Sequence, residues 1–438
     1  MLDSRYDSGV SREDSSMCLS RRALLERTGV TLLGAVLPAR EPGAAPDPPL
    51  PAPVAALKPM TAGLAPITKG EHESRILRAQ ALLGEAGLEA LVLASGSSLE
   101  YFTGAAWGLS ERFFGMILTR DGEPAWVTPA FEKERALEQV RVGTDVRAWE
   151  EHESPYALVA SVLRDRKATG QVGLEDAMPF AFASGMGEAL PASRMESGTS
   201  VTAGCRMVKD AHEVALMRRA CEITVCAHRA VFASLEEGVT QAQATALTRE
   251  AHQRLGVTGG SLVLFGESAA FPHGTRKPRP LRPGDVVLID GGGTLHGYGS
   301  DITRTMVFGA KPTDRQRQVW DLVRRAQEAA FRAARPGVPC EAVDAAARRV
   351  IEEGGFGPDY RAFTHRLGHG IGLDGHEYPY MVRGNTLPLR PGMTFTDEPG
   401  VYLYGEMGIR HEDVVCITQN GAEGMTRWTG SPEEPAVV

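Results

Sequence analysis

The chain has 438 residues, of which 42% are hydrophobic and 23% are charged, and its formal net charge is −8. This length accommodates two or three domains with a large buried core, and the composition is that of a globular protein. The acidic balance, without any block of lysine or arginine, argues against a nucleic-acid partner. The six cysteines, at positions 18, 205, 221, 226, 340 and 416, form no C-x-x-C pair. A disulfide framework or a thiolate metal site is therefore not expected.

The first 40 residues resemble a twin-arginine export signal. Arg21 and Arg22 precede a short apolar run at 28–37, which is too short to span a bilayer but suits the hydrophobic part of a signal peptide. Residues 1–40 are therefore predicted to be a signal peptide, and the protein is expected to be periplasmic or extracellular. The alternative is a cytoplasmic protein whose leader carries no signal. The long stretch before Arg21 and the lack of a clean A-x-A cleavage site favour that alternative.

Residues 41–68 are rich in proline and alanine and lack helical periodicity, so they are predicted to be an extended linker, with folded structure beginning near Lys69. Helix and strand patterns then alternate up to residue 203. "ESRILRAQALLGEAG" (73–87) predicts an amphipathic helix that ends at glycine, and "LEALVLAS" (88–95) predicts a buried strand. "FFGMILTRDGEPAWVTP" (113–129) predicts two strands joined through an Asp-Gly turn. Residues 69–203 are therefore predicted to form an α/β domain without a cluster of catalytic residue types.

Residues 204–438 contain an internal repeat. The segments "LRPGDVVLID" (281–290) and "LRPGMTFTDE" (389–398) begin with the same four residues, and each ends on an acid, Asp290 or Glu398. Each segment follows a Gly-Val turn and an amphipathic helix, and a further long helical stretch lies before these. This shared order of helices, strand and acid predicts a duplicated α+β domain with a pseudo-two-fold axis.

The acids of the repeat are predicted to converge. Asp290 and Asp301 are placed symmetrically about a glycine-rich turn, so an antiparallel hairpin with that register would place them opposite each other. Glu398 and Glu412 are likewise equidistant from Gly405. Four carboxylates this close would repel one another, and two divalent cations about 3.5–4 Å apart would neutralise them. The alternative, four ordinary exposed acids, does not explain the mirrored placement.

The stretch "FTHRLGHGIGLDGHE" (363–377) brings three histidines, His365, His369 and His376, into one glycine-rich segment. Its glycines disfavour a helix, so the spacing is unlike the helical zinc motif H-E-x-x-H. The segment is predicted to be extended backbone packed closely against a site, with the imidazoles projecting at separate points. A fourth histidine, His273, precedes the first acidic hairpin as this cluster precedes the second. A buried core histidine would explain one member of this group but not the set.

Taken together, "DGGG", "SDITRT", "HRLGHGIGLDGHE", "TDEPGVY" and "GIRHEDVV" resemble the pita-bread metallopeptidases, in particular the branch of Xaa-Pro dipeptidases (prolidases) and aminopeptidase P. The resemblance covers roughly residues 70–438. It implies a creatinase-type N-terminal α/β domain at 69–203 and a catalytic pita-bread domain at 204–438. It also implies that Asp290 binds one metal, that Asp301 and Glu412 bridge two metals, and that His369 and Glu398 bind the second.

By the same resemblance, His273 and His376 bind substrate and handle protons, His365 lies behind the metal ligands, and Arg410 organises the site. The implied reaction is hydrolysis of the Xaa-Pro bond at the N-terminus of dipeptides or short peptides, by a homodimer. Two cations, Mn foremost and Co or Zn as alternatives, would lower the pKa of a bridging water and generate a hydroxide nucleophile. Glu398 would accept its proton, and the two histidines would stabilise the tetrahedral intermediate or protonate the leaving amine.

Other functions fit the sequence less well. A metal-free creatinase-type enzyme or a non-catalytic peptide-binding relative would have lost ligand positions, yet all five are filled. A serine hydrolase requires G-x-S-x-G, which "GESAA" (266–270) does not supply. Another metal-dependent hydrolase or lyase on the same fold stays as the alternative, because fold and ligands fix the metals and not the substrate.

Two residues depart from the family pattern. His411 stands directly before Glu412, where an apolar residue is more usual, and Asp397 stands directly before Glu398. Either would alter the metal preference or the pH optimum if it faced the site. Neighbours on a strand face opposite sides, which would instead point both away from it.

Overall fold

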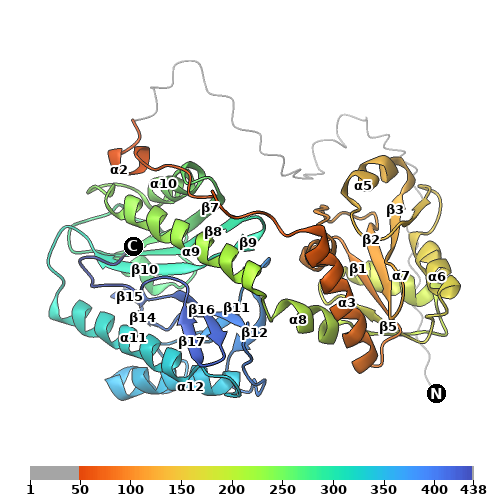
Figure 1. Cartoon of the computed structure of the whole chain (residues 1–438). Coiled ribbons are helices and arrows are strands. Elements are labelled where there is room, and N and C mark those ends of the chain that lie inside the picture. Colours follow the sequence, from red (N-terminus) through yellow and green to blue (C-terminus); the bar gives the residue numbers. More distant parts are fainter. Residues whose placement is uncertain (1–48, 437–438) are drawn as a thin grey trace, which may run out of the picture. The chain divides into compact units, whose positions relative to one another are not determined.

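The computed structural model describes residues 49–436 (Figure 1). The predicted signal peptide at 1–40 and the first part of the predicted linker lie outside the described residues. From Leu50 onward the chain forms one unit. Within the described part, no helix combines the length and the apolar character needed to cross a membrane.

Residues 50–68, here called the strap, pack against the C-terminal domain. The short helix α2 (Ala52–Ala55) buries Val54 completely in the same core as the helices and strands of that domain. The backbone amide of Met60 donates a hydrogen bond of 2.9 Å to the carbonyl of Leu255. Folded structure therefore begins before Lys69, and the expectation of an extended linker up to residue 68 is wrong for this part. The physical reason is that the strap's apolar side chains find their partners in distant elements, which local periodicity cannot reveal.

The N-terminal domain is built on a six-stranded sheet with the strand order β4-β3-β2-β1-β5-β6. Its strands are β1 (Ala90–Ala94), β2 (Gly115–Thr119), β3 (Ala125–Pro129), β4 (Asp145–Trp149), β5 (Gln171–Leu174) and β6 (Arg194–Ser197). Its helices are α3 (Lys69–Glu85), α4 (Ser97–Thr103), α5 (Lys133–Gln139), α6 (Pro155–Asp165), α7 (Phe180–Ala189) and α8 (Thr199–Arg206), with a 3₁₀ turn η1 (Ala130–Glu132). Strands β1, β2 and β3 are buried along their whole length, as their nearly continuous apolar sequences require.

The elements predicted for this domain are present. Helix α3 starts at a capping box, in which Thr68 and Glu71 satisfy each other's backbone amides, and the chain leaves it at Gly87 with φ of 74°. Strand β1 lies where the buried strand was predicted, and β2 and β3 form the antiparallel pair joined through the Asp-Gly turn. The predicted domain boundary between residues 203 and 204 falls within α8 and stays a prediction.

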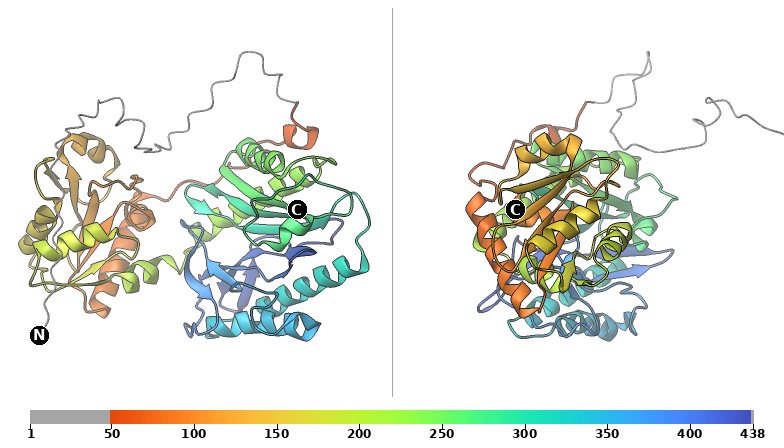
Figure 2. Two further views of the ribbon diagram at one scale, coloured as in Figure 1. Left: turned by 180° about the vertical axis from the view of Figure 1, so that it is seen from behind. Right: turned by 90° about the vertical axis from the view of Figure 1, so that its right-hand side faces the viewer.

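The C-terminal domain consists of two similar halves. The first contains α9 (Ala211–Phe232), α10 (Gln241–Arg254), β7 (Thr258–Phe265), η2 (Gly266–Ala270), β8 (Val286–Leu295), β9 (Tyr298–Gly299) and β10 (Ile302–Val307). The second contains α11 (Asp314–Ala333), α12 (Cys340–Ile351), η3 (Glu352–Phe356), β11 (Gly368–Gly370), β12 (Glu377–Met381), β13 (Thr394–Asp397), β14 (Gly400–Leu403), β15 (Met407–Arg410), β16 (Asp413–Thr418) and β17 (Gly421–Gly424). Helices α9 and α10 pack against the sheet β10-β8-β7. Helices α11 and α12 pack against strands of the sheet β12-β11-β13-β16-β17 (Figures 1 and 2).

Matching hydrogen bonds show that the two halves are copies of one unit. The amide of Gly238 donates to the carbonyl of Leu281, and the amide of Gly337 donates to the carbonyl of Leu389, each at 2.8 Å. Each leucine amide returns a bond of 2.9 Å to the valine that follows the glycine. Both glycines have positive φ, 88° and 84°. The Gly-Val turn and the Leu-Arg-Pro-Gly segment therefore perform the same structural role twice, and the predicted duplication is confirmed.

Candidate active site

The five predicted metal ligands lie together between the two halves of the C-terminal domain. Their donor atoms form overlapping groups in which all atoms lie within 4.8 Å of one another: Asp290 with Asp301 and Glu412, His369 with Glu398 and Glu412, and Asp301 with His369 and His376. Asp301, His369 and Glu412 each belong to two groups. His376, which the sequence assigned to substrate, is thus a further potential donor at the edge of this cluster.

The first hairpin places its acids by a different register from the predicted one. Asp290, on β8, pairs with Thr303 on β10 and not with Asp301. The turn between the strands consists of His296 and Gly297, whose φ values of 50° and 88° correspond to a two-residue turn with both residues left-handed. This turn shifts the predicted register by two residues. Because the side-chain period of a strand is two, the shift leaves the predicted carboxylates on one face.

The second hairpin has the predicted register. Gly400 pairs with Arg410, and Leu403 pairs with Met407, so the hairpin is centred on residue 405 as expected. The same register continues into the ladder of β13 with β16, where Asp397 pairs with Asp413. Glu398 and Glu412, which lie between these two ladders, are therefore brought opposite each other.

The glycine-rich histidine segment is extended only in part: residues 368–370 form β11, which lies between β12 and β13, and bends follow at 372–376. A Cβ atom on Gly368 would lie 1.7 Å from the carbonyl oxygen of Thr396, and one on Gly370 would lie 2.2 Å from that of Tyr378. Only glycine permits this approach of backbones, which seats His369 with its side chain 4% exposed. The Nε2 atom of His369 lies 3.2 Å from Glu398 Oε1 and 3.9 Å from Asp301 Oδ2.

The electrostatics of the metal-free protein show how strongly the carboxylates are crowded. Burial, together with the charges of Asp290 and Glu398, raises the pKa of Asp301 to about 8. Burial and the other three acids raise the pKa of Glu412 well above its usual range. For Glu398, burial acts in the same direction, but the hydrogen bond from His369 and the nearby cationic groups outweigh it and lower the pKa to about 2.

A threonine that the sequence analysis did not single out links the acids. The Thr303 hydroxyl lies 2.7 Å from Asp290 Oδ1 and 2.6 Å from Glu412 Oε2, and it accepts a bond of 3.1 Å from Arg410 Nε. A hydroxyl has one proton, so it satisfies only one of these carboxylates at a time. While the hydroxyl donates to one of the two carboxylates, the oxygen of the other carboxylate that faces it receives no proton from Thr303. That arrangement suits a site that receives cations. Thr303 lies two residues after Asp301 and therefore on the same face of the chain. This spacing could have identified Thr303 from the sequence as a neighbour of the metal ligands.

Arg410 occupies the organising position that the resemblance implied. Its guanidinium donates to Asp290 Oδ2 at 2.6 Å and to the Tyr402 hydroxyl at 2.7 Å, and the residue is only 3% exposed. His365 Nε2 lies 2.7 Å from the same hydroxyl, so His365 contacts the ligands through Tyr402 and Arg410. Burial lowers the pKa of His365, which keeps its imidazole neutral. Tyr402 ends the motif TDEPGVY, but the sequence assigned it no role, because that role depends on which side of the β14–β15 hairpin faces the site.

The two histidines assigned to substrate lie near the cluster. The ring of His376 stacks on that of His369, with 3.6 Å between the ring centroids. Burial and the charge of His369 lower the pKa of His376. His273 lies close enough to both His365 and His376 to affect their titration electrostatically.

The two residues that depart from the family pattern point away from the site. His411 is fully buried against the Trp320 ring, with 4.4 Å between ring centroids, and burial lowers its pKa to about 3. Asp397 is also fully buried, and neither of its carboxylate oxygens has a hydrogen-bond partner. Burial and the charges of Asp413 and Glu398 raise its pKa well above its usual range. Of the two outcomes considered for these residues, orientation away from the site is confirmed.

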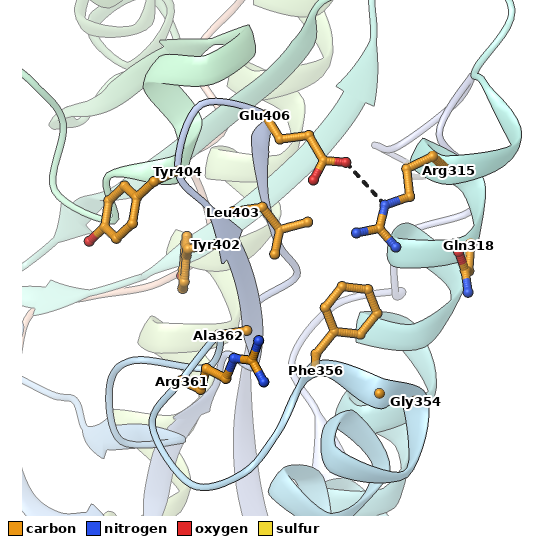
Figure 3. A pocket seen from close by; sticks show the side chains of 11 residues that line it. Arg315, Gln318, Gly354, Phe356, Arg361, Ala362, Tyr402, Leu403, Tyr404 and Glu406 are labelled. Carbon is orange, nitrogen blue, oxygen red and sulfur yellow. Dashed lines mark hydrogen bonds and ion pairs between the residues drawn. The ribbon is translucent and has the colours of Figure 1, made fainter.

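Two cavities adjoin these residues. One of about 190 Å³ is lined by His376 and Tyr380 and by residues of the N-terminal domain, including Glu175 and Arg206. The other, of about 440 Å³, is drawn in Figure 3 and contains none of the predicted ligands. Tyr402 forms part of its wall, and an ion pair of Arg315 with Glu406 lies at its rim. The smaller cavity is thus the one that reaches the cluster, through His376.

Comparisons with known proteins agree with this architecture. A model of metallopeptidase family M24 matches residues 215–419, and a model of the creatinase/prolidase N-terminal domain matches residues 75–208. A protein of Mycobacterium tuberculosis named "Probable dipeptidase PepE" is 40% identical over 84% of this chain and 96% of its own length. An Xaa-Pro dipeptidase of Lactobacillus delbrueckii is 33% identical over 78% of this chain and 94% of its own length.

A solved structure also resembles the chain closely. The crystal structure of dipeptidase PepE from Mycobacterium ulcerans matches with a TM-score of 0.77 and 37% identity, covering 83% of this chain and 97% of that one. The fold and the donor cluster thus define an enzyme with a creatinase-type N-terminal domain and a duplicated pita-bread catalytic domain. The chain belongs to metallopeptidase family M24. The resemblance and the fold class inferred from the motifs are confirmed.

Proposed function

We propose that this metallopeptidase uses two divalent metal ions to hydrolyse the Xaa-Pro bond at the N-terminus of dipeptides or short peptides. The observation that carries the proposal is the sharing of donors between groups, with Asp301 and Glu412 each belonging to two. Shared carboxylates are what two adjacent cations require, whereas a single ion needs only one group. The preference for proline rests on the names of relatives such as the Lactobacillus delbrueckii enzyme.

The proposed ligands are those that the resemblance implied: Asp290 for one ion, Asp301 and Glu412 shared by both, and His369 with Glu398 for the other. Carboxylate and imidazole donors suit Mn, with Co or Zn as alternatives. When bound, two such ions supply a water of lowered pKa and the positive charge that polarises the scissile carbonyl. Their charge would also counter the burial and the repulsion by Asp290 and Glu398 that together raise the pKa of Asp301 to about 8 in the metal-free protein.

The chain's own residues would then hold and move protons. Glu398 is ionised, because its pKa is lowered to about 2 by His369 and the nearby cationic groups, and it accepts a proton from the attacking water. His376 is neutral because burial lowers its pKa, so with His273 it would stabilise the charge on the tetrahedral intermediate by hydrogen bonding, or would relay to the leaving amine the proton that Glu398 has taken from the water.

The test uses protein that keeps the strap, because residues 50–68 pack against the catalytic domain. Residues 49–438 would be stripped with chelator, reloaded with Mn²⁺, and assayed for release of proline from Ala-Pro and from Ala-Pro-Ala. Metal-dependent cleavage of Ala-Pro alone would define a prolidase, and cleavage of Ala-Pro-Ala an aminopeptidase P. Stoichiometric metal binding without cleavage of either would overturn the substrate assignment and favour another metal-dependent hydrolase or lyase.

Two further parts of the proposal rest on the sequence. We propose a homodimer, which light scattering on the full chain would test. We also propose export through residues 1–40, which lie outside the described residues. Fusion of this segment to a reporter, with Arg21 and Arg22 both replaced by Lys as the control, would test the export.

A further inference from the structure

A chain of three buried polar side chains lies between the helices of the first half and its sheet. It consists of His252 on α10, Thr224 on α9 and Ser300, which directly precedes Asp301. Nε2 of His252 lies 3.2 Å from the Thr224 hydroxyl, and that hydroxyl lies 2.8 Å from the Ser300 hydroxyl. Burial of three polar side chains is costly unless they bond to one another, so this chain holds its members together.

The hydrogen bonds of the chain run in one direction. Nδ1 of His252 lies 2.8 Å from the carbonyl oxygen of Thr248, which can only accept, so Nδ1 carries the proton of the imidazole. Burial lowers the pKa of His252, which keeps the ring neutral and leaves Nε2 as an acceptor. The Thr224 hydroxyl therefore donates to Nε2 and accepts from the Ser300 hydroxyl. The Ser300 oxygen in turn accepts from the amide of Gly293 at 3.0 Å, whereas the Gly293 carbonyl, also 3.0 Å away, already accepts from the Ser300 amide.

The imidazole of His252 fits because two paired strands carry glycine beneath it. A Cβ atom on Gly259 of β7 or on Gly293 of β8 would lie 2.8 Å from Cδ2 of His252. The two glycines pair with each other in the ladder of β7 with β8. Glycine in the segment that follows Asp290 therefore leaves the space that the ring fills.

Ser300 fixes the backbone at an interruption of the first hairpin's ladder. Strand β9 ends at residue 299 and β10 begins at residue 302, so Ser300 and Asp301 lie between two segments that pair with β8. In this interval, the amide and the hydroxyl of Ser300 both bond to the backbone of Gly293. Neighbouring residues of an extended chain face opposite sides, so the Ser300 hydroxyl meets α9 while the Asp301 carboxylate joins the metal-ligand cluster.

We propose that His252 and Thr224 are positioning residues of the metal site, which fix Ser300 and thereby the carboxylate of Asp301. This inference rests on the proposed dinuclear site, in which Asp301 is shared by both ions. A shared carboxylate has to reach two ions at once, so its position is more restricted than that of a ligand to one ion. Without the chain, the backbone at the interrupted ladder gains freedom that metal binding then has to remove.

The test measures the affinity for Mn²⁺ by calorimetric titration of the full chain after stripping with chelator. Thr224→Val keeps the shape of the side chain but removes the hydroxyl, and it is expected to weaken Mn²⁺ binding by about tenfold, a usual effect of losing a group that orients a metal ligand. Thr224→Ser should restore most of the affinity. Thr103→Val is the matched control and should leave Mn²⁺ binding unchanged. Thr103 is also fully buried in a helix, and its hydroxyl also makes two hydrogen bonds, but with Leu99 and Ala105.

A double-variant cycle separates a connected chain from a general loosening of the core. Ser300→Ala should weaken Mn²⁺ binding about as much as Thr224→Val does, and the double variant should bind no more weakly than either, because both changes break the same chain. His252→Phe, which keeps a flat ring against the glycines but lacks the nitrogens, should weaken binding similarly. Multiplied losses in the double variant, or parental Mn²⁺ affinity in any of the three single variants, would overturn the inference.

The same titration distinguishes this inference from the proposed function, because Mn²⁺ binding does not require peptide cleavage. If the parent binds Mn²⁺ but cleaves neither Ala-Pro nor Ala-Pro-Ala, the substrate assignment fails, and the affinities of the variants still decide the role of the chain. If the parent cleaves Ala-Pro and Thr224→Val binds Mn²⁺ as tightly as the parent, only the positioning role fails. A parent protein that binds no Mn²⁺ would overturn both.

Discussion

At the scale of single residues, the site is a set of acids that repel one another until a cation joins them. Asp301 is central, because it shares a donor group with Asp290 and Glu412 and another with His369 and His376. Burial and the neighbouring acids raise its pKa in the metal-free protein. Removing this carboxylate should therefore harm metal binding and leave the fold intact.

Asp301→Asn is expected to lower kcat/KM by about a thousandfold or more, because an amide cannot bridge two cations as a carboxylate does. Metal analysis should show fewer than two bound ions per chain. The thermal unfolding midpoint of the metal-free variant should equal or exceed that of the metal-free parent, since a buried acid crowded by Asp290 and Glu398 is replaced by a neutral amide. Asp321→Asn, at an exposed position of α11, is the control and should change neither property. Full turnover by the Asp301 variant would contradict the assignment.

Thr303 supports the ligands through its hydroxyl. Thr303→Val keeps the shape of the side chain but removes the hydroxyl's contacts with Asp290 and Glu412. The expected result is a ten- to hundredfold loss of metal affinity, which is about the effect of losing such a supporting partner. Calorimetric titration with Mn²⁺ would measure it. Thr303→Ser should restore most of the affinity. If the valine and serine variants bind metal equally, the hydroxyl has no such role.

At the scale of elements, strand β11 is fixed by close contact of backbones. Gly368→Ala would place a Cβ atom 1.7 Å from the carbonyl of Thr396, so β11 would have to move away from β13 and carry His369 with it. A loss of about 2–4 kcal/mol in the free energy of unfolding is expected, together with weaker metal binding. Denaturant titration would measure the stability. Gly375→Ala is the matched control, because nothing lies within 4 Å of the added Cβ, and it should leave both properties unchanged.

The ion pair between α3 and α9 should give a pH-dependent contribution to stability. His212 Nδ1 lies 2.7 Å from Glu71 Oε1, and this hydrogen bond is the main cause that raises the pKa of His212 above 6.5. That contribution is complete below pH 6.5 and is lost as the pH rises through the raised pKa. For Glu71, burial opposes the shift, but hydrogen bonds with Thr68 and His212 lower the pKa from 4.5 to about 2. Its contribution is therefore present above pH 4.5 and is lost as the pH falls toward 2.

Glu71→Gln removes this charge but keeps a side chain that can complete the capping box. The unfolding midpoint should fall most between pH 4.5 and 6.5, by an amount equivalent to about 0.5–1 kcal/mol, and less at higher pH. Glu73→Gln is the control, because Glu73 pairs only with exposed Lys69 on the same helix. A deficit that does not vary with pH would contradict the role of the pair.

At the scale of the whole molecule, the strap joins the catalytic domain's core. Val54 is fully buried there, and Leu57, Met60 and Leu64 pack against the same cluster. A protein that starts at residue 69 should therefore unfold at a lower temperature than one that starts at residue 49. The free energy of unfolding is expected to differ by about 3 kcal/mol or more between the two proteins, because burial of a single large aliphatic side chain contributes about 1.5–3 kcal/mol. Calorimetry on the two proteins would measure it, and equal midpoints would show that the strap adds no stability.

The sequence by itself determined the duplicated domain, the family and the set of residues that meet at the site. These follow from local signals, such as the repeated Leu-Arg-Pro-Gly turn, the Gly-rich histidine segment and the symmetric placement of acids about two turns. The same local signals could not fix how the strands pair. The register of the first hairpin differed by two residues because the turn at His296–Gly297 took the two-residue form.

Only the tertiary structure decided which residues support the ligands and where the strap lies. Thr303 and Tyr402 act through contacts with Glu412 and His365, which lie 109 and 37 positions away in the chain, and Val54 is buried among helices that follow it by more than 150 positions. A strand's alternation tells which face a side chain takes, but it does not tell what stands opposite that face. That information exists only once the two halves of the domain and the strap have packed together.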